Sequence, residues 1–470
     1  MTVLPLPLAR ADVQRAFLGN LAASSGEAAM RFLLGLALAR LLHPADLGLF
    51  AMAMAVLGIA QLLRDFGVSA YLQREPVLTP QRFSACLGLQ LCTTLVALLA
   101  LWLLAQPLSR VLGQPALAPL LRVLAFGLPA SAFGSVMAAL QLRELAAVRI
   151  AKVSWLGVVT QALVAISLSA EGAGAMGLAW AQVSAAYACS LAYLAWRPSN
   201  LPWRPARQGW VEVLRFGGGA LIASGLASLH AALPDLLLGR LGAPHQLGLL
   251  GRAQATVNLL QVVAGQALNF GALPLLASRH ARGQALAPAL QRATALLTGL
   301  AWPLLALTVA YREPLVLLLY GPAWLDCTAA VLPLALVAAL GLAFTQFSAA
   351  LAAVGRPELA AWPTALSLAA RIGFGLALFD GSLASFAWAL GAAALLAAPV
   401  QLVIAARHLG QPPRALLGAV AGSVLATLAV LAVPLSLAPL AWLAALRWSR
   451  HALLDEALQL LARRRMTSRK

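Results

Sequence analysis

The residues of this sequence that could bind a ligand are charged side chains standing inside long apolar stretches. Eight such positions stand out: Glu27, Arg31, Arg64, Asp65, Arg122, Asp235, Arg252 and Arg371. A charge at the centre of a bilayer costs about 2.5–3.5 kcal/mol on insertion scales, so each should face a cavity or a partner. A guanidinium stays protonated when partly desolvated and can hold two oxygens of one anion. Arginines at these positions therefore suit an anionic ligand.

Three of the arginines, with help from a fourth, are expected to line a cationic central cavity. The three are Arg31, Arg122 and Arg371, and the fourth is Arg252. For Arg122 and Arg252 the alternative is that the side chain reaches the outer headgroups, because both stand near the expected outer surface. Arg64 and Asp65 come at the cytoplasmic end of their helix and are candidates for a gate.

The acidic residues have two interpretations each. Glu27 and Arg31 are spaced i, i+4, so one helical turn separates them and they can pair. Such a pair fits a structural role as well as a role in transport. Asp235 could take up a proton or a cation, or it could be the local partner of Arg240 or Arg252.

No pattern in the sequence indicates catalysis, a metal site or a cofactor. Cys86, Cys92, Cys189 and Cys327 show no CxxC spacing and no neighbouring histidine, so they predict neither a zinc site nor a disulfide framework. No loop between apolar stretches exceeds about 20 residues, which leaves no room for a folded catalytic domain outside the membrane. We expect a protein that is not an enzyme, with an integral-membrane glycosyltransferase or ligase as an alternative.

The apolar stretches around these charges predict membrane-spanning helices. Of the 470 residues, 61% are hydrophobic and 10% charged, against about 45–50% and 25% in soluble domains. About 20 helical residues cover the ~30 Å of a bilayer core, and many stretches reach that length. We predict an all-α polytopic membrane protein with 12 to 14 transmembrane helices. The stretch 415–446 is too long for one crossing and contains Pro434, which predicts a helix followed by a shorter partner.

The basic residues predict the orientation of the helices and not a nucleic-acid partner, although the formal net charge is +18. With a cytoplasmic N-terminus, 24 of the 33 Lys and Arg residues fall on the cytoplasmic side. Only Arg40, Arg110, Arg240 and Arg312 fall in outer loops. This bias predicts that both termini are cytoplasmic. The basic tail after residue 450 predicts an amphipathic helix on anionic phospholipid.

The sequence contains an internal repeat with an interval of 200 residues. Residues 36–55 align without a gap with residues 236–255, and both copies carry the pattern RL-x-x-P-x-x-LGL. We expect a six-helix bundle in 1–200, a second in 201–410, and one or two extra helices with the basic tail in 411–470. Two bundles inserted in the same direction indicate a transporter in which one bundle rocks against the other.

Four segments resemble the Wzx-like oligosaccharide and polysaccharide flippases of the multidrug/oligosaccharidyl-lipid/polysaccharide (MOP) exporter superfamily. Residues 39–49, ARLLHPADLGL, are similar to that family's first outer turn. Residues 65–74, DFGVSAYLQR, are similar to the stretch that ends its second helix. Residues 235–253 resemble the opening of its second half, and residues 313–324 resemble the outer loop before its tenth helix.

The resemblance implies a cargo and a location. The cargo would be an undecaprenyl-diphosphate-linked oligosaccharide, moved to the periplasmic leaflet of a bacterial inner membrane for O-antigen, capsule or exopolysaccharide assembly. The diphosphate would be the ligand of the arginine-lined cavity. A monomeric flippase working with a polysaccharide polymerase and glycosyltransferases is implied. A small-molecule or drug antiporter of the same superfamily is the alternative, and its cavity would be expected to hold mainly acidic residues.

Overall fold

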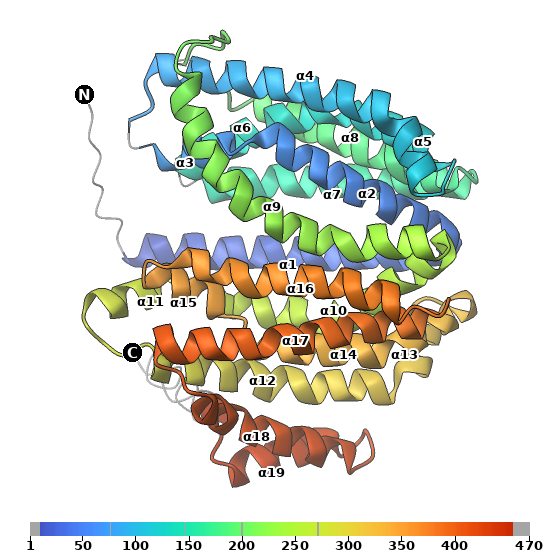
Figure 1. Cartoon of the computed structure of the whole chain (residues 1–470), viewed down its shortest axis with the longest axis vertical. Helices are drawn as coiled ribbons and strands as arrows, with labels where there is room; N and C mark the ends of the chain where they lie inside the picture. Colours follow the sequence, from blue (N-terminus) through green and yellow to red (C-terminus); the bar gives the residue numbers. More distant parts are fainter. Residues whose placement is uncertain (1–9, 76, 145, 199–200, 270–271, 455–470) are drawn as a thin grey trace. The chain divides into compact units, whose positions relative to one another are not determined.

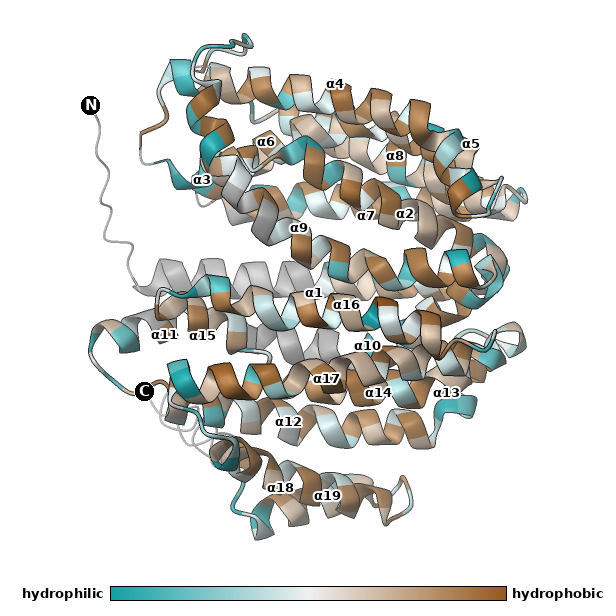
Figure 2. Ribbon diagram, in the orientation of Figure 1, coloured by the Kyte–Doolittle hydropathy of each residue, from teal (hydrophilic) through white to brown (hydrophobic). Residues whose placement is uncertain are grey.

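The computed structural model describes residues 10–75, 77–144, 146–198, 201–269 and 272–454 (Figure 1). All the regular elements in these ranges are helices, which confirms the predicted all-α class. Apolar residues cover most of the helical surface, and hydrophilic residues gather at helix ends and in the connections (Figure 2). That distribution is typical of helices whose surroundings are lipid.

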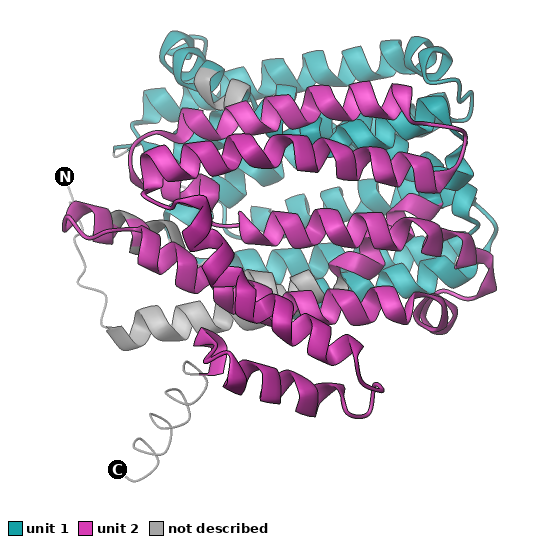
Figure 3. Cartoon of the chain, turned by 60° about the horizontal axis from the view of Figure 1, so that its bottom comes forward, with its two compact units in different colours: residues 1–248 teal, residues 249–470 magenta. Residues whose placement is uncertain are grey.

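The chain forms two compact units, residues 1–248 and residues 249–470 (Figure 3). Unit 1 contains α1 (Arg10–Leu41), α2 (Pro44–Asp65), α3 (Val68–Arg74), α4 (Pro80–Val111), α5 (Leu117–Ala125), α6 (Gly127–Arg143), α7 (Ala147–Ala170), α8 (Gly174–Leu194), α9 (Trp210–Leu241) and the first turn of α10 (Pro244–Asn269).

Unit 2 contains the rest of α10 and the elements that follow it. These are α11 (Ala272–Ala281), α12 (Ala287–Ala310), α13 (Arg312–Leu319), η1 (Pro322–Cys327), α14 (Thr328–Ala343), α15 (Phe347–Ala353), η2 (Pro357–Ala360), α16 (Ala361–Ala377), α17 (Leu383–Leu409), α18 (Pro413–Leu431) and α19 (Ala438–Trp448).

Many of these helices are long enough to cross a bilayer. Within the described ranges, eight satisfy both length and hydropathy, and the bent pair α5 and α6 would make a ninth. The helices α1, α8, α9 and α10 have 32, 21, 32 and 26 residues, which is also enough to span. The expected break at Pro434 is confirmed, because α18 ends before it and α19 begins after it. The expected amphipathic tail helix falls mostly on residues 455–470, outside the described residues.

Within unit 1, α9 packs closely along α2, and two glycines of α9 lie at the contact. A Cβ atom on Gly217 would lie 2.1 Å from the carbonyl oxygen of Phe66. A Cβ atom on Gly239 would lie 2.1 Å from the Cε atom of Met52. Small residues permit such close backbone approach in membrane helices. α9 begins after the predicted boundary at residue 200, and it belongs to unit 1. The organisation into 1–200, 201–410 and 411–470 stays a prediction.

The two copies of the sequence repeat fold into the same turn and contact each other inside unit 1. In each copy one helix ends and the next begins at a proline, Pro44 or Pro244. A Cβ atom on Gly48 would lie 1.8 Å from the carbonyl oxygen of Pro244, and one on Gly248 would lie 1.9 Å from that of Pro44. Each copy of the turn thus requires the glycine of the other.

Alanine at Gly48 or Gly248 should destabilise the protein, because the added methyl group collides with backbone that cannot rotate away. Overpacking of this kind costs about 1–3 kcal/mol, which corresponds to a fall in Tm of about 2–12 °C. Thermal unfolding of purified protein in detergent measures the effect. Gly58→Ala is the matched control on α2, because a Cβ atom there meets nothing within 4 Å. A Tm for Gly48→Ala equal to that of Gly58→Ala would contradict the close contact.

A buried chain of hydrogen bonds holds the C-terminal helices against α12 in unit 2. The backbone N–H of Leu453 donates to Nδ1 of His451 at 3.2 Å, so the ring proton is on Nε2. Nε2 lies 3.1 Å from Oγ of Ser423 on α18, which lies 2.8 Å from Oγ1 of Thr298 on α12. The Thr298 hydroxyl donates onward to the carbonyl of Thr294. Every link in this chain therefore has one donor and one acceptor.

Replacing Ser423 with alanine should destabilise unit 2, because the change removes the link between His451 and Thr298. A buried polar group left without its partner costs about 1–3 kcal/mol, so we expect a fall in Tm of a few degrees. Ser436→Ala, in the exposed turn between α18 and α19, is the control and should leave Tm unchanged. Equal melting temperatures for the two variants would show that these hydrogen bonds do not stabilise the packing of the C-terminal helices on α12.

Candidate ligand-binding site

The structure confirms the ion pair between Glu27 and Arg31 on α1. The Oε1 atom of Glu27 accepts from Nη2 of Arg31 at 2.9 Å and from Nε at 3.1 Å. One carboxylate oxygen thus receives two N–H groups from one side of the guanidinium. This is the geometry that the i, i+4 spacing predicts.

Two glutamines on neighbouring helices extend this pair. The Nη1 atom of Arg31 donates to Oε1 of Gln161 on α7 at 3.5 Å. The Nε2 atom of Gln161 donates to Oε1 of Gln182 on α8 at 3.0 Å. We call Glu27, Arg31, Gln161 and Gln182 the polar cluster. Neither glutamine is among the sequence-predicted site residues, although an amide in an otherwise apolar helix is a signal that could identify each of them.

The polar cluster lies at the depth of the middle of a bilayer. Arg31 comes ten residues before α1 ends, or about 15 Å along the helix. Gln182 comes eight residues after α8 begins, or about 12 Å. The Arg31 side chain is nevertheless 55% exposed. Because a charge exposed to acyl chains at this depth is costly, we expect the open side of the cluster to face water.

The other expected site residues of unit 1 take part in separate contacts. The Arg122 guanidinium lies over the ring of Trp102, 5.5 Å from its centroid. Arg64 is buried, and its Nη1 atom donates to Oγ of Ser135 at 3.2 Å. These contacts do not involve the polar cluster, so the structure does not bring the expected cavity arginines of unit 1 together. Their cavity and gate roles stay predictions.

Asp65 and Asp235, the two acidic candidates outside the polar cluster, have different surroundings. Asp65 accepts a hydrogen bond from the Ser69 hydroxyl at 2.5 Å, which ties it to α3. Asp235 on α9 is partly buried. Among the described contacts of unit 1 it forms no ion pair with Arg240, one of its two predicted partners. A coupling role for Asp235 stays a prediction.

In unit 2, Arg252 is held by aromatic rings and Arg371 stands in the middle of a helix. The Arg252 guanidinium lies 5.6 Å from the ring centroids of both Tyr320 and Trp324. Cation–π contacts of this kind satisfy a charge without a carboxylate. Arg371 comes ten residues after α16 begins, about 15 Å along the helix, and is partly buried.

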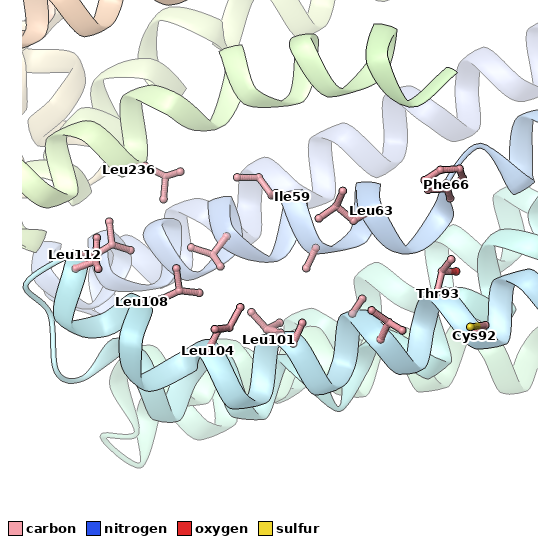
Figure 4. Close-up of a pocket in the computed structure, with 16 residues that line it drawn as sticks. Ile59, Leu63, Phe66, Cys92, Thr93, Leu101, Leu104, Leu108, Leu112 and Leu236 are labelled. Atoms are coloured by element: carbon pink, nitrogen blue, oxygen red, sulfur yellow. The ribbon is translucent and has the colours of Figure 1, made fainter. Parts of the chain in front are cut away.

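An apolar groove of about 590 Å³ lies between α2 and α4 in unit 1 (Figure 4). Leucines such as Leu63, Leu104 and Leu108 point into it, and Cys92 and Thr93 lie at one end. Its lining contains no charged residue. A groove of this composition can hold hydrocarbon, but it offers no group that could bind a diphosphate.

Comparison with solved structures identifies the fold of this protein. In a structural comparison, a structure described as "Lipid II flippase MurJ, inward closed conformation" matches with a TM-score of 0.75 and 9% identity, over 93% of this chain and 98% of that one. An inward-facing multidrug resistance MATE family transporter of the MOP superfamily matches with a TM-score of 0.64 and 16% identity, over 82% and 94%. The fold is that of a MOP-type polytopic membrane protein.

The family follows from the sequence itself. The model of the polysaccharide biosynthesis protein family matches residues 37–329, and the chain belongs to this family. That family and the structural neighbours confirm the resemblance seen in the sequence. No curated protein matches the sequence in a direct search.

Cysteine labelling should show that the polar cluster faces water. In a variant whose four native cysteines are alanine, Arg31→Cys should react at least about tenfold faster with a membrane-impermeant thiol reagent than Leu33→Cys, because only a thiolate in water reacts. Leu33 is the matched control, since it lies on the same helix and is 57% exposed. Equal rates at the two positions would mean that Arg31 faces the same surroundings as Leu33.

Proposed function

We propose that this protein is a flippase for an undecaprenyl-diphosphate-linked oligosaccharide, moving it from the cytoplasmic to the periplasmic leaflet by alternating access. Family membership supports a role in polysaccharide biosynthesis. The MOP-type fold supports transport by two membrane bundles. The product would serve O-antigen, capsule or exopolysaccharide assembly, and the protein would lie in a bacterial inner membrane with both termini in the cytoplasm.

The observation that carries this proposal is the polar cluster at mid-bilayer depth. A protein that only packs in lipid gains nothing from an exposed guanidinium about 15 Å from the helix end. A water-filled space at that depth is what the hydrophilic headgroup of a lipid-linked sugar needs in order to cross. The protein would act as a monomer, supplied by glycosyltransferases and followed by a polymerase, with anionic phospholipid around its basic surfaces.

Among the four arginines proposed for the diphosphate, Arg371 is the first to test. Glu27 already neutralises Arg31, and Arg122 and Arg252 lie on aromatic rings. Arg371 stands ten residues into α16, about 15 Å along the helix, and its side chain is partly buried. A guanidinium there can hold two phosphate oxygens at once. Glu27 and Asp235 remain proposed for ion coupling, and Arg64 and Asp65 for the cytoplasmic gate.

Arg371→Gln should lower transport at least about tenfold, and Arg371→Lys should retain part of it, because an ammonium group binds an oxyanion at one point only. Purified protein is reconstituted into liposomes with lipid-linked oligosaccharide, and a membrane-impermeant lectin or glycosidase reports sugar that reaches the opposite leaflet. Arg414→Gln, at an exposed position at the start of α18, is the control.

The outcomes separate the proposed function from its alternatives. Wild-type protein that moves no lipid-linked oligosaccharide, but exchanges small cationic molecules for protons, would favour the antiporter. Protein that transfers sugar between lipids would favour a membrane glycosyltransferase. Full transport by a well-folded Arg371→Gln variant would remove Arg371 from the diphosphate site and leave the flippase function intact.

A further inference from the structure

The guanidinium of Arg31 has donors left over after its described contacts are made. A guanidinium carries five N–H groups. Arg31 uses Nε and one N–H of Nη2 on Glu27, and one N–H of Nη1 on Gln161. One N–H on each terminal nitrogen remains. With more than half of the side chain exposed, these two groups can bind a ligand.

The polar cluster also presents acceptors and neutral donors. In the described contacts the Oε2 atom of Glu27 accepts no hydrogen bond, and the Nε2 amide of Gln182 donates none. The cluster therefore offers two guanidinium N–H groups and a carboxylate oxygen on α1 and an amide N–H₂ group on α8. Its formal charge is zero, because the charge of Glu27 balances that of Arg31.

This composition does not match a diphosphate. A phosphate only accepts hydrogen bonds at neutral pH, and it would be repelled by the Glu27 carboxylate next to Arg31. A sugar hydroxyl both donates and accepts, so a ring with several hydroxyls can bind the donors and the acceptor of the cluster at the same time. An uncharged group with many hydroxyls therefore suits a site that has both hydrogen-bond donors and acceptors and no net charge.

A half-buried aromatic ring lies beside the cluster. The Cζ2 atom of Trp155 on α7 would be 2.6 Å from a Cβ atom on Gly26, the residue before Glu27. Glycine at this position therefore lets the indole lie against α1. The apolar face of a pyranose ring packs on such a surface, while the hydroxyls at its edge reach polar groups. The indole could therefore pack against the apolar face of a sugar ring while the polar cluster binds its hydroxyls.

We propose that the polar cluster binds the sugar of the lipid-linked cargo and not its diphosphate. This inference rests on the proposed flippase function. It gives Arg31 a role different from the one expected from the sequence, because its pairing with Glu27 removes the net positive charge. Gln161 is a positioning residue, since its carbonyl holds Arg31 and its amide holds Gln182. Gln182 and the free side of Arg31 contact the sugar.

The test compares two lipids on the full-length protein in liposomes. One is the lipid-linked oligosaccharide that accumulates in cells from which this protein has been deleted, and the other is sugar-free undecaprenyl diphosphate. Binding of each is measured by titration. Gln182→Met and Gln161→Met keep the side-chain length and remove the hydrogen bonds. Each should weaken binding of the oligosaccharide lipid about three- to tenfold, the value of one or two hydrogen bonds, and change binding of the sugar-free lipid less than about twofold.

A charge substitution gives a readout that a structural role would not produce. Glu27→Gln removes the repelling carboxylate and leaves Arg31 charged, so it should strengthen binding of sugar-free undecaprenyl diphosphate. The preference for the oligosaccharide lipid should fall at the same time. Gln106→Met, an exposed amide on α4 outside the cluster, is the matched control and should change neither affinity.

The results separate this inference from the proposed function. Wild-type protein that binds and moves neither lipid would refute the flippase function. Wild-type protein that moves the oligosaccharide lipid, with glutamine variants that weaken both lipids equally or neither, would overturn the sugar site alone. A Glu27→Gln variant with an unchanged preference would also overturn it. Tm measured for each variant shows that the affinities belong to folded protein.

Discussion

The structure depends on one constraint, which is that every polar group inside a bilayer must have a partner or face water. The helices meet this constraint for the backbone, and the side chains meet it in several different ways. Arg122 and Arg252 lie on aromatic rings, Arg64 donates to a serine hydroxyl, and His451 is hydrogen-bonded to the Ser423 hydroxyl. The polar cluster differs from these because it stays exposed at mid-depth. An exposed charge at that depth distinguishes a candidate ligand site from a packing contact.

Close backbone approach is the second requirement, and proline and glycine of the repeat supply it. Pro44 and Pro244 begin helices at the same place in each copy. Their carbonyl oxygens occupy the space in which a side chain of Gly248 or Gly48 would otherwise stand. A repeat is usually evidence of common ancestry only, but here it also has a physical consequence. Because the contact is reciprocal, a change in one copy alters the fit of the other.

The sequence predicts the features that depend on local spacing and on strong hydropathy contrasts. The helix class, the break at Pro434 and the pair of Glu27 with Arg31 are of this kind, because each depends on residues close together along the chain. The partners from other helices could not be found in this way. Gln161 is 130 positions from Arg31, and an amide hardly changes the hydropathy of its helix. The packing of α9 on α2 depends likewise on tertiary contacts between glycines of α9 and residues far from them in the sequence.

Charge balance decides how recognition could be divided between the sugar and the diphosphate of the proposed cargo. A diphosphate is shared by lipid-linked sugars of any structure, so arginines that bind it confer affinity but no selectivity. Selectivity needs groups that lose their hydrogen bonds when a hydroxyl is absent or differently oriented, because unpaired polar groups in a confined site are costly. A neutral cluster with donors on Arg31 and Gln182 and an acceptor on Glu27 has this property, whereas an isolated arginine does not. The pairing of Arg31 within its own helix thus limits its attraction for phosphate and makes its remaining donors available for a neutral partner.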